Sequence, residues 1–140
     1  MGVLLSWRGA ISYMVNKSYI ILKVLFSGFM LFSALGELTL NETVVQSMAY
    51  IEMPVYLLYF LGVSKLLGII ALWYSPYKFL RDWAYAGFTF DFLGAIYGFI
   101  ATGHMVLPDI VMAPTGLLLC ILTYYYWKKS NVLVERIGTI

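Results

Sequence analysis

Residues 82–95, DWAYAGFTFDFLGA, decide the fold of this chain because they hold one carboxylate, Asp91, inside an apolar and aromatic run. Transfer of an isolated charge from water to an apolar medium is very costly unless the charge is paired. The fold must therefore bring a cation to Asp91, and the rest of the sequence shows where that cation comes from.

The composition of the whole chain indicates a membrane protein. Of its 140 residues, 62% are hydrophobic, 18% are aromatic and 11% are charged, whereas a soluble domain carries about 25% charged residues. Four long apolar stretches follow one another, each of roughly the length that crosses a bilayer. A soluble all-helical protein with unusually buried helices is the alternative that this composition disfavours.

We predict an all-α fold, a transmembrane four-helix bundle of antiparallel up-down topology that forms a single domain over residues 1–140. A short interfacial helix is expected over residues 3–15, and the polar connection 39–52 is expected to be partly helical. Pro114 lacks an amide proton and predicts a kink. The expected membrane-spanning helices cover residues 19–38, 54–73, 83–102 and 107–127.

The distribution of Lys and Arg predicts the orientation in the membrane. The chain has nine such residues, and seven of them flank one side of the predicted bundle, which short-loop charge rules assign to the cytoplasm. Both termini are therefore expected to be cytoplasmic, with residues 19–38 retained as the first span because this run is too long for a signal peptide. The seven are Arg8, Lys17, Lys78, Arg81, Lys128, Lys129 and Arg136.

Lys65 is the predicted partner of Asp91. Lys65 lies 11 residues after Pro54, and Asp91 lies 11 residues before Thr102. At about 1.5 Å per residue, both residues sit about 16 Å below the same boundary of the membrane. The pair has two readings: a structural ion pair that fixes helix register, or a proton-responsive or ligand-binding site between helices.

Small residues flank both charges and predict close helix packing. Gly94 and Gly98 form a GxxxG pattern, which lets membrane helices approach one another closely. A stripe of small residues centred on a charge is a stronger signal than that pattern alone. The predicted packing residues are Gly62 and Gly68 around Lys65, and Ala84, Gly87, Gly94 and Gly98 around Asp91.

Other polar residues lie near the predicted ends of the spans. Lys23 is near the cytoplasmic end and can extend its ammonium to the interface. Four residues near the outer end are candidates for lining an outer vestibule, and ordinary interfacial charge is their alternative reading. These four are Glu37, Glu52, His104 and Asp109.

The sequence offers little for a self-contained active site. Its one cysteine, Cys120, cannot form an intrachain disulfide or a zinc site and is read as an apolar packing residue. One histidine leaves no histidine cluster for a metal, and no nucleophile pattern or phosphate-binding loop is recognised. The basic residues are explained by the membrane, so nucleic acid is not an expected partner, and no cofactor is recognised.

Two segments together resemble the DoxX-like family of small four-helix membrane proteins. They are LGVSKLLGIIAL (61–72) and LRDWAYAGFTFDFLGA (80–95), and the likeness extends over about residues 19–129. The resemblance implies a shared motif of Lys65 and Asp91 with Gly62, Gly68, Gly87 and Gly94. Relatives often carry a histidine three to five residues after the GA of the second segment, but here that stretch begins with Tyr97.

The resemblance implies a place in a bacterial cell membrane but no settled activity. Related proteins are associated with thiosulfate–quinone oxidoreduction as small subunits and with oxidative-stress membrane complexes, and distant eukaryotic relatives act as receptor-assembly chaperones. We therefore expect a non-catalytic accessory subunit or assembly partner, in contact with the bilayer and with a protein partner or further copies of itself. The alternatives are a quinone-linked subunit of an oxidoreductase, with aromatic side chains flanking the ring, and an oligomeric carrier of small solutes or protons.

Overall fold

Five helices account for nearly all of residues 2–103 and 107–138, the residues that the computed structural model describes. No strand occurs in these two ranges, and the all-α prediction is confirmed. The helices are α1 (Gly2–Leu38), α2 (Glu42–Tyr50), α3 (Leu57–Tyr74), α4 (Lys78–Thr102) and α5 (Leu107–Gly138).

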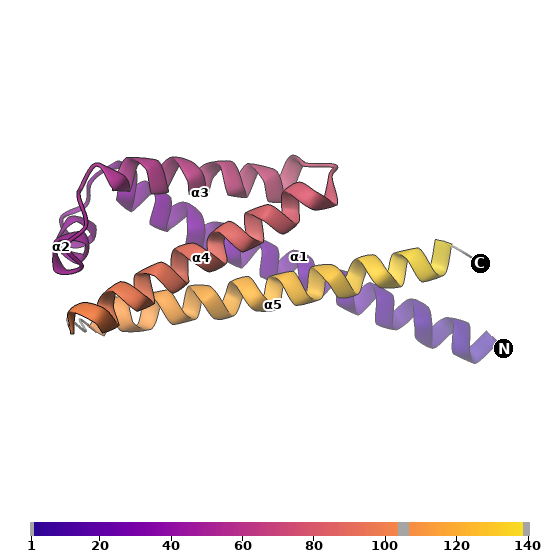
Figure 1. Cartoon of the computed structure of the whole chain (residues 1–140). Coiled ribbons are helices and arrows are strands. Elements are labelled where there is room, and N and C mark those ends of the chain that lie inside the picture. Colours follow the sequence, from indigo (N-terminus) through magenta and orange to yellow (C-terminus); the bar gives the residue numbers. More distant parts are fainter. Residues whose placement is uncertain (1, 104–106, 139–140) are drawn as a thin grey trace.

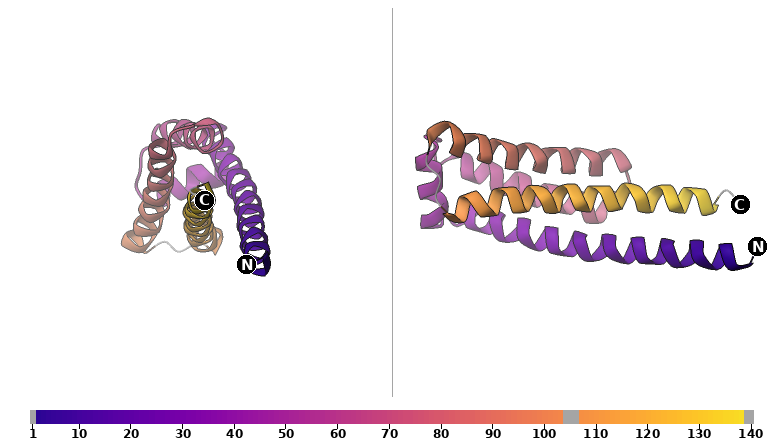
Figure 2. Two further views of the ribbon diagram at one scale, coloured as in Figure 1. Left: turned by 90° about the vertical axis from the view of Figure 1, so that its right-hand side faces the viewer. Right: turned by 90° about the horizontal axis from the view of Figure 1, so that it is seen from below.

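The four long helices form an antiparallel bundle (Figure 1). Both α1 and α4 contact α3 and α5, so the order around the bundle is α1, α3, α4, α5, as the end-on view in Figure 2 shows. The two chain termini lie at one end and α2 lies at the other. Each long helix contains a segment long and apolar enough to cross a membrane: Gly9–Leu38, Leu57–Tyr74, Lys78–Thr102 and Leu107–Arg136.

The first and last spans are longer than expected. Residues 3–15 do not form a separate interfacial helix, because α1 runs without interruption from Gly2. The junction at residues 16–18 contains neither Gly nor Pro, the two residues that most readily end a helix. At the other end of the chain, α5 continues through Pro114 and past the expected end at residue 127.

The connection between the first two spans contains the short helix α2, so the partly helical prediction for residues 39–52 is confirmed. Leu40 adopts a left-handed conformation with φ of 50° where the chain leaves α1. The Asn41 side chain then accepts a hydrogen bond of 3.0 Å from the Thr43 amide and caps the new helix. Met48 is buried and anchors α2 over the end of the bundle.

The core of the bundle is largely aromatic. The rings of Phe26 and Phe88 meet edge to face with centroids 5.2 Å apart, a favourable geometry for aromatic pairs. Phe92 packs beside Gly116 of α5, where the missing side chain leaves room for the ring. The remaining buried members of this cluster are Tyr19, Met30, Leu72, Tyr85, Cys120 and Trp127.

Candidate functional site

Three spans contribute charged side chains to one buried cluster. The Lys65 ammonium of α3 forms an ion pair with Glu37 Oε1 of α1 and lies 3.2 Å from Asp91 Oδ2 of α4. It also donates a 3.2 Å hydrogen bond to Ser33 Oγ, one turn before Glu37. The side chains of Lys65 and Glu37 are each 8% exposed and that of Asp91 is 20% exposed. These four residues are called the charge cluster below.

Side-chain direction explains why residues at different depths meet. Side chains in an α-helix lean toward the N-terminus of their own helix. Because α3 begins at the α2 end of the bundle, Lys65 leans toward that end. The antiparallel α1 ends there, so Glu37 leans away from the end and toward Lys65. The two side chains therefore approach each other from opposite directions along the bundle.

Two glycines of α3 allow the close approach of its neighbours. A Cβ added to Gly62 would lie 2.8 Å from the Leu38 side chain and 3.2 Å from the Ala34 carbonyl oxygen, both of α1. A Cβ added to Gly68 would overlap the ring of Phe88 on α4. Gly62 and Gly68 thus bracket Lys65 and let its helix lie close to α1 and α4, the two helices that carry the carboxylates.

Glu37 was expected in an outer vestibule, and the structure instead places it against Lys65. A count of residues from the membrane boundary locates the Cα atoms only, so it misses the reach of the lysine side chain. The sequence signal for this contact is the Ser33–Ala34–Glu37 face of α1. It presents a small residue to Gly62 and two acceptors to Lys65.

The other vestibule candidates have separate surroundings. Asp109 of α5 accepts a 2.9 Å hydrogen bond from Ser47 Oγ of α2 and so ties these two helices together. Glu52 is exposed on the connection to α3, where its φ is 56°. His104 lies outside the described residues.

The small residues of α4 divide into two groups. Ala84 packs against the aromatic core, and a Cβ on Gly98 would lie 3.2 Å from Ile51. In contrast, Gly87 and Gly94 are exposed, and a Cβ at either position would meet no atom within 4 Å. The structure thus places these two glycines on the outside of the bundle rather than at the helix contact we expected.

A second polar group lies nearer the chain termini. The sequence predicted the position of its lysine but not the contact that the lysine makes. Lys23 of α1 is buried, and its ammonium lies 4.2 Å from the ring centroid of Trp73 on α3. The same indole donates a 2.9 Å hydrogen bond to Ser27 Oγ. Trp73 therefore acts as a partner for Lys23 inside the bundle, which differs from the expected extension to the interface.

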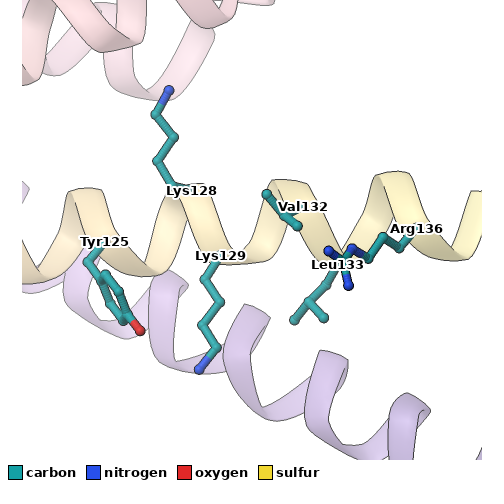
Figure 3. Close-up of a pocket in the computed structure, with 6 residues that line it drawn as sticks. All are labelled: Tyr125, Lys128, Lys129, Val132, Leu133 and Arg136. Carbon is teal, nitrogen blue, oxygen red and sulfur yellow. The ribbon is translucent and has the colours of Figure 1, made fainter.

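The end of the bundle that carries the termini is rich in basic side chains. Figure 3 shows Lys128 directed toward α4, where it pairs with Asp82 at 3.0 Å, while Tyr125 and Lys129 point toward α1. Lys78 forms an exposed ion pair with Glu135. A shallow pocket at this end is lined by Tyr125, Lys128, Lys129, Val132, Leu133 and Arg136.

A groove of about 310 Å³ lies between α4 and α5. Tyr85 and Tyr124 line it together with Thr89 and Cys120. The Tyr85 hydroxyl is buried and interacts with the buried Tyr19 hydroxyl of α1. Within residues 2–103 and 107–138, no group of His, Cys, Asp and Glu is arranged to hold a metal ion.

Comparison with known proteins identifies the family of this chain. The family model described as the DoxX-like family matches residues 21–123, a range that contains the whole charge cluster. No curated protein and no solved structure matches the chain.

Proposed function

This chain belongs to the DoxX-like family and is a multi-pass integral membrane protein, and from that premise we propose that it is a non-catalytic accessory subunit or assembly partner. The proposal rests on the outer side of α4, which has the features of a helix-docking surface. Its expected occupant is a transmembrane helix of a partner membrane protein.

The α4 outer face consists of Trp83, Gly87, Phe90, Gly94 and Tyr97. The three aromatic side chains are 67%, 74% and 74% exposed, and the glycines between them border open space. The residues are separated alternately by four and three positions, which is the spacing of a helix–helix contact. Large aromatic side chains thus alternate with glycines, which have no side chain, along one face of the helix.

Such a surface suits a partner helix better than lipid alone. Lipid tails are as apolar as the side chains of the helix, so helices associate in membranes through close packing and hydrogen bonds. The exposed glycines permit that packing, and the aromatic side chains between them fit gaps in a partner. This arrangement supports a role in which the protein binds and stabilises another membrane component.

The test replaces each outer glycine with leucine. Gly87→Leu and Gly94→Leu should reduce the co-purification of the native partner and lower the mass of the complex extracted from native membranes. Gly28→Leu is the matched control, because Gly28 on α1 also borders open space but lies on another face. An unchanged complex in both α4 variants would refute the proposal, as would a complex made only of copies of this chain.

A quinone-linked role is the second candidate, and the groove between α4 and α5 favours it. Two tyrosine rings border this groove. The Tyr85 hydroxyl interacts with the Tyr19 hydroxyl of α1, and such a pair retains one hydroxyl hydrogen for a carbonyl oxygen. Quinone binding should raise the thermal transition of the purified protein in detergent. Tyr85→Phe should remove that rise while keeping the ring packing, and an equal rise in both forms would exclude this site.

A further inference from the structure

The charges buried in the cluster do not balance, and we propose that Glu37 and Asp91 together bind one exchangeable proton. Lys65 supplies one positive charge, whereas the two carboxylates supply two negative charges when both are ionised. A charge without a counter-charge is strongly unfavourable within a membrane. One proton shared by the two carboxyl groups would make the cluster neutral. This inference is independent of the proposed partner.

The hydrogen bonds of Lys65 lead to the same conclusion. An ammonium has three donors. Lys65 donates hydrogen bonds to Glu37 Oε1 and Ser33 Oγ and forms an ion pair with Asp91 Oδ2 at 3.2 Å. Glu37 Oε2 is buried and has no partner among the described residues. The ammonium makes no hydrogen bond to this oxygen, and the nearby Ser33 hydroxyl carries no charge. A proton is therefore the means by which the cluster can neutralise its second carboxylate.

The other charged groups described near this end of the bundle are bonded elsewhere, exposed or distant. Asp109 of α5 is bonded to Ser47 of α2. Glu42 of α2 is exposed to the surroundings. Lys23 lies 14 residues before Glu37 on α1, about 21 Å along the helix axis. Among residues 2–103 and 107–138, none of these groups is therefore placed to neutralise the second carboxylate.

Asp91 provides the route by which the proton exchanges. Its side chain is 20% exposed, whereas that of Glu37 is 8% exposed. Asp91 is therefore the more accessible of the two carboxyl groups, and the proton exchanges through it.

Infrared spectroscopy of the protein in lipid nanodiscs at neutral pH tests the proposal. The wild-type protein should show the C=O band of a protonated carboxyl group, shifted in D2O and lost on titration to alkaline pH. Either Glu37→Gln or Asp91→Asn should abolish the band, because the remaining carboxylate then pairs with Lys65 alone. The control Asp109→Asn should leave the band unchanged.

Two results would overturn the proposal. Absence of the band from the wild-type protein would show that both carboxyl groups are ionised, and this result does not depend on any variant being folded. Loss of the band in only one of the two variants would assign the proton to a single buried carboxyl group rather than to the pair. Circular dichroism establishes that the variants under comparison retain their helices.

Discussion

Lys65 connects three spans because its ammonium contacts one carboxylate from α1, one from α4 and a hydroxyl from α1. A buried ion pair seldom stabilises a fold more than apolar residues of the same volume, but removal of one partner leaves an uncompensated charge. The consequence of a substitution therefore depends on which member of the cluster is removed.

Lys65→Met should be the most damaging single change in the cluster, because it leaves both carboxylates without their cation. We expect the free energy of unfolding to fall by about 3–5 kcal/mol, the usual loss when a buried pair is broken. Asp91→Asn should cost less, because Glu37 still pairs with Lys65. Thermal unfolding of the purified variants in detergent measures both effects.

Lys128→Met is the matched control for this prediction. Lys128 pairs with Asp82 at 3.0 Å, but their side chains are 48% and 36% exposed. An exposed pair contributes less than about 1 kcal/mol, so the unfolding temperature should change little. A loss in Lys128→Met as large as that in Lys65→Met would contradict the view that burial makes the cluster important.

The sequence predicted part of this cluster and missed the rest for a physical reason. Equal distances from the span ends suggested that Lys65 and Asp91 would lie at one depth, and their charged atoms are 3.2 Å apart. Glu37 lies only one residue before the end of α1. Counting residues from the span ends therefore placed Glu37 and Lys65 at different depths. The direction and length of the lysine side chain, which a count of residues ignores, close that separation.

At the scale of the helices, α4 shows why the position of small residues does not by itself identify the buried face. Its buried residues are Tyr85, Phe88 and Phe92, at the helical spacing of i, i+3 and i+7. These large rings bury more area than a glycine can and therefore turn Gly87 and Gly94 outward. The sequence predicted the helix itself well, but its rotation depends on the neighbours it packs against.

The close contacts of Gly116 on α5 lead to a prediction about the packing of three helices. A Cβ on Gly116 would overlap the rings of Phe92 on α4 and Phe29 on α1. Gly116→Ala should therefore lower stability by about 1–3 kcal/mol, the usual cost of overpacking a core. Thermal unfolding in detergent is the measurement.

Gly28→Ala is the corresponding control in an uncrowded helix position. Nothing lies within 4 Å of a Cβ at Gly28 on α1, and alanine favours a helix over glycine by up to about 1 kcal/mol. This variant should be as stable as the wild-type protein or more so. If Gly116→Ala behaved in the same way, the close packing of α5 on α1 and α4 would be refuted.

For the whole molecule, the structure separates two chemically different ends. One end carries both termini (Figure 1) and the basic side chains around Lys78, Lys128 and Lys129. The other carries α2 and the Asp109–Ser47 contact. The sequence predicted this division, because an even number of spans brings the termini together and the basic residues flank them.

The same division leads to a prediction of orientation in the membrane. We propose that the end with the termini faces the cytoplasm, because short loops rich in Lys and Arg remain on that side. Two single-cysteine variants are made in a Cys120→Ala background. Thr43→Cys places an exposed thiol at the α2 end of the bundle, and Val134→Cys places one at the end with the termini. A membrane-impermeant maleimide should label Thr43→Cys on intact bacterial spheroplasts, and Val134→Cys only after permeabilisation. Labelling in the reverse order would show that the charge distribution does not set the orientation of this bundle.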